Sequence, residues 1–146
     1  MSHHRCFFDA FVRDSGSIGA VVPSSKELAR LMLEWLDWSE IGSVVEFGTG
    51  TGVFTEAIWE NLKPGASFLA IERAPVLAEI TRSRCPGVDL HEACVSKVAE
   101  ICDISGVKNV DAIICGLPWA SFSSEVQNVF LSAMFEVLPP GGQFAT

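Results

Sequence analysis

Three glycines at alternate positions, Gly48, Gly50 and Gly52, follow an apolar stretch and are the part of the sequence that most directly indicates chemistry. Because glycine has no Cβ, the backbone there can turn through positive φ and a ligand can approach it closely. Glu46 lies two residues before the first glycine. A dinucleotide-binding loop would have its third glycine where Val53 stands and would not place a carboxylate beside a phosphate. The spacing therefore predicts a cofactor loop for a nucleotide-like ligand that carries a positive charge.

A second acid follows at the distance expected of a nucleotide-binding unit. The apolar stretch 43–47 predicts a strand, 53–62 a helix that Lys63-Pro64-Gly65 ends, and 67–71 a second strand that leads to Glu72. Glu72 falls about 20 residues beyond the last glycine, where a βαβ unit presents a carboxylate to ribose hydroxyls. A solvated strand end is the alternative for Glu72, and a carboxylate that caps a helix or braces the turn is the alternative for Glu46.

Helical and strand patterns alternate along the rest of the chain. Ser24 and Ser25 have the residue type of an N-cap for a helix over 26–36. Further helices are predicted at 75–84, from about 96, and at 122–137, with strands at 88–91 and 111–115 and the start of a fifth at 142–146. This alternation is typical of an α/β fold: a Rossmann-like, doubly wound and mostly parallel sheet.

The predicted fourth strand ends at the tetrad Gly116, Leu117, Pro118 and Trp119, which is the second signal of a site. Catalytic groups in open α/β sheets gather at the carboxyl ends of strands beside the switch in strand order. Proline fixes the turn, and the tryptophan offers a π face that can hold a cationic or planar acceptor nitrogen. The alternative is a hydrophobic turn residue that covers the last helix.

These motifs resemble those of class I methyltransferases, which use S-adenosylmethionine. Glu-Phe-Gly-Thr-Gly-Thr-Gly resembles their motif I, and Gly-Leu-Pro-Trp resembles the motif IV of enzymes that methylate amino nitrogens, such as the rRNA adenine dimethylases. Those dimethylases have asparagine where this chain has Gly116. The segment 16–29, with Val-Pro-Ser-Ser, is similar to the entry segment of bacterial phospholipid N-methyltransferases, which methylate phosphatidylethanolamine. The resemblance runs from about Gly16 to the C-terminus and implies S-adenosylmethionine as the cofactor.

The resemblance also implies a role for individual positions. It places the methionine part of the cofactor at Glu46, Gly48, Thr49, Gly50 and Gly52, the ribose at Glu72, and the adenine beside Arg73, Ala93 and Cys94. It places the sulfonium side at Gly116 and Leu117, the catalytic turn at Gly116, Leu117, Pro118 and Trp119, and a closing segment at Val22, Ser24 and Ser25.

Composition limits the classes of partner. A net charge of −8 with no strong basic cluster disfavours a nucleic-acid substrate, because phosphate contacts supply most non-specific affinity. The five cysteines form no zinc-ligand spacing, so reduced thiols and no metal site are expected. Without a signal peptide or a membrane-spanning stretch, the expected location is cytoplasmic, peripheral at the inner face of the membrane.

Two domain-level expectations follow. Residues 1–15 form an amphipathic segment that lies either at a membrane interface or on the protein's own core, and 16–146 form the cofactor-binding domain. Class I methyltransferases have a seven-stranded sheet, so this chain is expected to lack the last strands and to form a homo-oligomer through the edge that is left.

The sequence predicts an S-adenosylmethionine-dependent N-methyltransferase, with the amino headgroup of a phospholipid such as phosphatidylethanolamine as the acceptor. Two alternatives stay open: an RNA adenine N6-methyltransferase, which the same Leu-Pro-aromatic turn supports, and a non-catalytic cofactor-binding or scaffold domain.

Overall fold

Five parallel strands form the centre of the protein in the computed structural model, which describes residues 25–146. The strands are β1 (Ser43–Phe47), β2 (Ser67–Glu72), β3 (Asp89–Glu92), β4 (Ala112–Cys115) and β5 (Gln143–Ala145). Their order is β3-β2-β1-β4-β5, and each neighbouring pair is parallel. Every residue of β1 and β4 is buried, as expected for strands covered on both faces. The predicted mostly parallel α/β sheet is confirmed.

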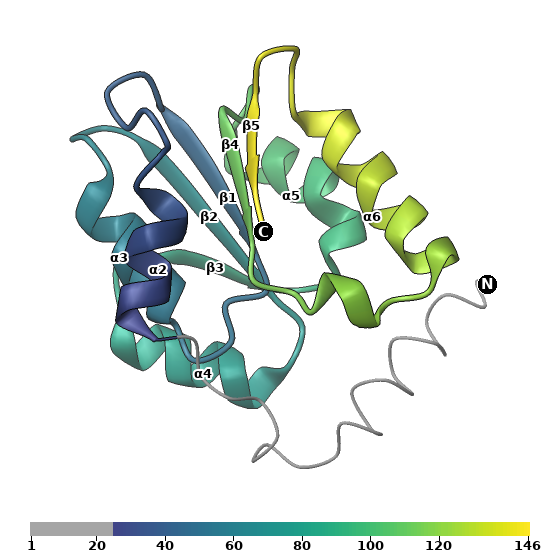
Figure 1. Ribbon diagram of the computed structural model, residues 1–146, viewed down its shortest axis with the longest axis horizontal. Coiled ribbons are helices and arrows are strands. Elements are labelled where there is room, and N and C mark those ends of the chain that lie inside the picture. The colour runs from purple at the N-terminus through teal and green to yellow at the C-terminus, as the bar shows by residue number, and fades with distance from the viewer. Residues whose placement is uncertain (1–24) are drawn as a thin grey trace.

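Helices cover both faces of this sheet. They are α2 (Lys26–Leu33), α3 (Val53–Asn61), α4 (Pro75–Arg84), α5 (Val98–Ser105) and α6 (Ser124–Val137), with short 3-10 turns η1 (Val95–Lys97) and η2 (Trp119–Ser121). Figure 1 shows α2, α3 and α4 on one side of the sheet and α5 and α6 on the other. The domain is therefore a three-layer sandwich whose strand ends lie between two helical layers.

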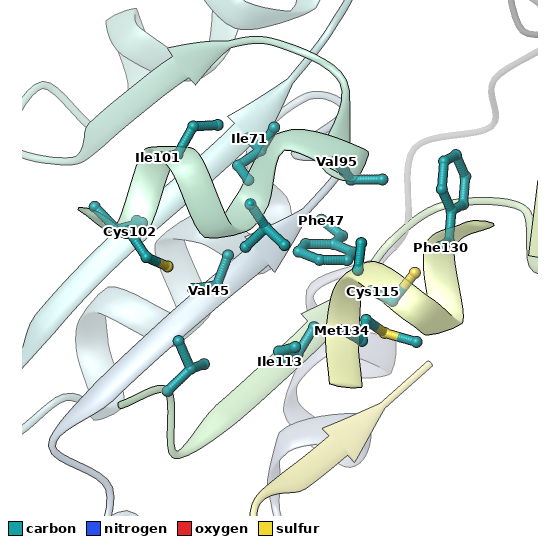
Figure 2. Packing of buried hydrophobic residues seen from close by; sticks show 14 of the residues in the cluster. Val45, Phe47, Ile71, Val95, Ile101, Cys102, Ile113, Cys115, Phe130 and Met134 are labelled. Atoms are coloured by element: carbon teal, nitrogen blue, oxygen red, sulfur yellow. The ribbon is translucent and has the colours of Figure 1, made fainter. Parts of the chain in front are cut away.

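Alternation along β1 divides its side chains between two cores. Val45 and Phe47 point into the core beneath α5 and α6, where Figure 2 shows Phe47 among residues of several elements. Val44 belongs to the second core, beneath α2 and α3. Because successive residues of a strand face opposite sides, Glu46 shares the α3 side with Val44. A carboxylate is thus held in an apolar layer.

Most predicted elements are confirmed, with small shifts at their ends. Ser25 caps α2, since its hydroxyl accepts a 3.1 Å hydrogen bond from the Leu28 N–H. The helix predicted over 26–36 ends at Leu33, because the Leu33 carbonyl accepts the indole N–H of Trp38 and the N–H of Leu36 instead of continuing the helix.

Two other boundaries also differ from the prediction. The helix expected from about residue 96 begins as η1 and becomes α5 at Val98. The last helix begins at Ser124 and not at Phe122, because the Ser123 hydroxyl accepts from the Val126 N–H and caps it there. Residues 1–24, with the predicted amphipathic segment, lie outside the described residues. None of the helices within 25–146 is long and apolar enough to cross a membrane.

Candidate functional site

The carboxyl ends of β1 to β4 meet at one edge of the sheet. Chain order reverses between β1 and β4, and ligands of open α/β sheets bind at such a switch point. A small cavity lies here, lined by Gly48, Ile71, Glu72, Arg73, Ala93, Cys94, Val95, Leu117 and Phe130. Six residues predicted for the site are therefore brought together: Gly48, Glu72, Arg73, Ala93, Cys94 and Leu117.

The glycine-rich turn has the backbone conformation that its sequence predicts. Gly48, Gly50 and Gly52 have φ angles of 76°, 55° and 85°, a region that residues with a Cβ rarely adopt. A Cβ on Gly48 would lie 2.4 Å from the Cδ2 atom of Leu117, whereas a Cβ on Gly50 would meet nothing within 4 Å. Gly48 is needed for close packing, and Gly50 faces open space that a ligand can use.

Glu72 is tied to this turn. Its carboxylate accepts hydrogen bonds from the Gly50 N–H at 3.1 Å and from the Ala74 N–H at 2.9 Å, and the residue is 8% exposed. The alternative of a solvated strand end is therefore wrong. Glu72 lies at the end of β2 with its side chain against the glycine-rich turn.

Glu46 is the most unusual group of the site. The residue is 0% exposed, and its Oε2 accepts a 2.7 Å hydrogen bond from the Thr55 hydroxyl of α3. Its other oxygen, Oε1, has no hydrogen-bond partner among the described residues. Burial raises the Glu46 pKa to about 8; the Thr55 hydrogen bond lowers it, and the charge of Glu72 raises it. The carboxyl is therefore mostly protonated at neutral pH, with one oxygen left for a further partner.

Thr55 was missed by the sequence reasoning. It lies in the first turn of α3 and is fully buried. The only sequence signal for it is a hydroxyl residue among apolar residues at the start of the predicted helix. Thr49, predicted to contact the cofactor, is 4% exposed and its hydroxyl lies 2.9 Å from that of Thr81 in α4. Thr81 was also missed.

The turn after β4 is built around close contact with the glycine loop. The Gly116 N–H donates to the Phe47 carbonyl at 2.8 Å, and a Cβ on Gly116 would lie 2.6 Å from the Gly48 carbonyl oxygen. Leu117 lines the cavity, and Pro118 leads into η2. Backbone contact thus requires a glycine at 116.

Trp119 is half-buried and packs against the core beneath α6. Its ring meets that of Phe144 in an edge-on arrangement with centroids 6.3 Å apart, and its carbonyl accepts from the Gln127 side chain. This packing agrees with the hydrophobic-turn alternative. A contact of Trp119 with an acceptor stays a prediction, as does the catalytic role of its tetrad.

Three further predicted residues, Val22, Ser24 and Ser25, belong to the closing segment. Val22 and Ser24 lie outside the described residues, and Ser25 caps α2. Within 25–146 the cysteines are free thiols and no cluster of potential metal ligands occurs. Burial raises the pKa of the Cys115 thiol, which keeps it protonated beside the site.

Comparison with known proteins agrees with this geometry. A family model described as a methyltransferase domain matches residues 44–142. The chain is 30% identical over 141 residues to the ornithine lipid N-methyltransferase of Singulisphaera acidiphila, covering 94% of this chain and 73% of that protein.

Solved structures with the same fold include TrmN and two proteins named as methyltransferases. TrmN from Thermus thermophilus has a TM-score of 0.65 at 18% identity, over 87% of this chain and 39% of its own. The Bacillus cereus O-methyltransferase in complex with SAH has a TM-score of 0.69 at 14% identity, over 84% of this chain and 56% of its own. The SAM-bound amino pentose methyltransferase CalS10 from Micromonospora echinaspora has a TM-score of 0.58 at 20% identity, over 93% of this chain and 53% of its own. This chain thus spans between 39% and 56% of these structures.

The family match covers the glycine loop, Glu72 and the turn after β4, which the fold brings to one edge of the sheet. The protein therefore belongs to the class I methyltransferase family, whose cofactor is S-adenosylmethionine.

Proposed function

We propose that this domain transfers a methyl group from S-adenosylmethionine to the amino group of a membrane lipid headgroup. The observation that carries the proposal is the 30% identity, over 94% of the chain, to an ornithine lipid N-methyltransferase. Phosphatidylethanolamine and ornithine lipids both present an amine at the membrane surface. Lipid-amine methylation is thus the shared chemistry.

The residues present fit this cofactor. S-Adenosylmethionine has an ammonium and a sulfonium centre. The buried Glu46 carboxyl lies beside the glycine loop, its Oε1 has no hydrogen-bond partner among residues 25–146, and the group can ionise when a cation binds next to it. Glu72 offers its carboxylate to the ribose hydroxyls, and Ala93 and Cys94 line the cavity where the adenine would lie. When bound, the cofactor supplies the electrophilic methyl group. The domain contributes binding, alignment and exclusion of water.

Gly116 bears on the choice of acceptor. An asparagine at this position would hold an adenine amino group, but its Cβ would lie 2.6 Å from the Gly48 carbonyl oxygen. The Gly48 carbonyl belongs to the backbone and cannot move aside as a flexible side chain does, so an asparagine at position 116 is excluded from this turn. Together with the net charge of −8, this favours an aliphatic amine over an RNA base.

A lipid substrate requires contact with a membrane surface. Three large apolar side chains of α2 and the turn after it, Leu28, Leu31 and Trp35, are 50%, 51% and 59% exposed. Leu28 and Leu31 lie three residues apart and form an apolar stripe on one face of α2, and Trp35 follows in the turn after the helix. This stripe supports a peripheral position on the bilayer, where apolar side chains enter the interface.

The test uses methyl-labelled S-adenosylmethionine with four separate acceptors: vesicles containing phosphatidylethanolamine, vesicles containing an ornithine lipid, phosphatidylcholine vesicles, and ribosomal RNA. We expect label in either amine-containing lipid and none in phosphatidylcholine. Label in RNA would replace the lipid proposal with the adenine alternative. Binding of the cofactor without label in any arm would contradict the lipid proposal and favour the scaffold alternative.

A pair of glycine variants provides the control. Gly50→Val fills the open side of the cofactor loop and should abolish both cofactor binding and transfer. Gly65 also has positive φ, and a Cβ there would meet nothing within 4 Å, but it lies in the turn between α3 and β2. Gly65→Val carries the same backbone strain and should leave cofactor affinity within about twofold of the wild type.

A further inference from the structure

Side chains of α4 hydrogen-bond to the backbone of the cofactor loop. Thr81 is 0% exposed, and its hydroxyl donates a 3.2 Å hydrogen bond to the Gly50 carbonyl. The same oxygen lies 2.9 Å from the Thr49 hydroxyl. A threonine has one hydroxyl hydrogen, so Thr81 donates to Gly50 and accepts from Thr49. The three groups form a directed chain of hydrogen bonds from the loop to the helix and back.

Gly50 is thereby held on both sides. Its N–H donates to Glu72 at 3.1 Å and its carbonyl accepts from Thr81. A trans peptide points its carbonyl and its N–H in opposite directions. Turning the Gly50 carbonyl toward α4 therefore directs the Thr51 N–H away from α4. A positive φ of 55° at Gly50 is maintained by partners on two different elements.

Arg84 holds the next carbonyl of the loop. Its Nη1 donates to the Thr51 carbonyl at 3.0 Å, and its Nε lies 3.5 Å from a carboxylate oxygen of Glu56 in α3. The Arg84 Cδ would lie 3.2 Å from a Cβ on Gly52, so its stem also packs against the end of the loop. Thr81 and Arg84 thus bind two successive carbonyls from adjacent turns of one helix.

We infer that Thr81 and Arg84 are positioning residues for cofactor binding: they set the glycine loop in its binding conformation before S-adenosylmethionine arrives. Neither side chain lines the cavity described above, so both act through the loop. A loop that is already ordered loses less conformational entropy when the ligand binds. The inference depends on the cofactor of the family and is independent of the acceptor.

The main variant is Thr81→Val, which keeps the shape of the side chain and removes the hydroxyl. It leaves the Gly50 carbonyl and the Thr49 hydroxyl without their shared partner. We expect the dissociation constant for S-adenosylmethionine, measured by calorimetry, to rise about tenfold. Thr81→Ser keeps the hydroxyl and should restore the affinity to within about threefold.

The second readout is hydrogen exchange of the cofactor-free protein. We expect the Gly50 and Gly52 amides to exchange about tenfold faster in Thr81→Val, with the amides of β1 unchanged. Ser43→Ala is the matched control, because it removes another buried hydroxyl, one that donates to the Asn109 carbonyl at the opposite end of β1. Ser43→Ala should lower stability without changing cofactor affinity or loop exchange.

Arg84→Met is a further variant at a partly exposed position, where loss of folding is not expected. It should weaken cofactor binding about threefold to tenfold. Wild-type affinity and wild-type loop exchange in Thr81→Val would overturn the inference. So would equal losses of affinity in Thr81→Val and Ser43→Ala, because that result would assign both to general stability. If Thr81→Val fails to fold, unchanged affinity in Arg84→Met and normal loop exchange would overturn it instead.

Discussion

Replacing Glu46 with glutamine should make the cofactor-free protein more stable, and increasingly so as the pH rises. Glutamine has the shape of the protonated carboxyl and can accept the same hydrogen bond from Thr55. Burial raises the Glu46 pKa from 4.5 to about 8. The Glu46 carboxyl thus ionises at lower pH in the unfolded chain than in the folded protein. The contribution of Glu46 to stability is greatest below pH 4.5 and is lost as the pH rises through the folded-state pKa of about 8.

The magnitude follows from those two pKa values. Across the whole window the loss approaches about 5 kcal/mol, and between about pH 6 and pH 8 it amounts to about 2 kcal/mol. Glu46→Gln has no ionisation and should not show this loss. When the two proteins are compared at each pH, the contributions of the ionisable groups that they share cancel.

Urea unfolding at several pH values measures the difference. The free energy of unfolding of Glu46→Gln minus that of the wild type should grow by about 2 kcal/mol from about pH 6 to pH 8. Glu60→Gln is the control, because it removes the same charge from an exposed position of α3. Parallel curves for wild type and Glu46→Gln would refute a buried, protonated Glu46.

Cofactor binding should depend on pH in the opposite sense. If the ionised Glu46 meets the cationic part of S-adenosylmethionine, wild-type affinity should rise about 30-fold from about pH 5.5 to pH 7, below the usual pKa of an α-amino group. Calorimetry in buffers of different ionisation enthalpy should detect about one proton released on binding at pH 7. Glu46→Gln should bind more weakly at pH 7 and lose this pH dependence. A flat wild-type profile would refute the placement of the cofactor cation at Glu46.

Two further glycine substitutions test the backbone. Gly116→Ala should reduce cofactor affinity by at least about tenfold. The new Cβ would lie 2.6 Å from the Gly48 carbonyl oxygen, so the two loops would have to move apart. An affinity equal to that of the wild type, measured by calorimetry, would contradict this. Gly106 ends α5 with a φ of 73°, and a Cβ there would meet nothing within 4 Å. Gly106→Ala should therefore lower the free energy of unfolding, measured in urea, by about 1 kcal/mol through backbone strain alone. It should leave cofactor affinity unchanged. Gly106→Asn should cost less, since asparagine tolerates this conformation better, and equal losses would count against the φ argument.

Much of the fold could be predicted because its signals are local. Pro75 at the first position of α4 and the run up to Arg84 predicted that helix over its observed bounds. The boundaries that shifted depend on partners outside the local pattern. Trp38, for example, takes the Leu33 carbonyl and ends α2 early.

The site was predictable to the extent that its residues follow strand ends. Glu72, Ala93 and Leu117 line one cavity because parallel strands bring their carboxyl ends to one edge. Thr55 and Thr81 were missed, since each lies on the core-facing side of a helix and becomes part of the site only through its contact with β1 or the loop. A buried hydroxyl has no sequence pattern that distinguishes such a partner from ordinary packing.

The sequence by itself determined the order of strands and helices, the positive-φ turn at three glycines, and the methyltransferase family, because these depend on residue type and spacing along the chain. Only the tertiary structure decided that Glu46 is buried with one oxygen that has no hydrogen-bond partner within residues 25–146, and that α4 holds the glycine loop. Those properties depend on which elements come together, since desolvation and hydrogen bonding act between groups that are close in space and distant in sequence.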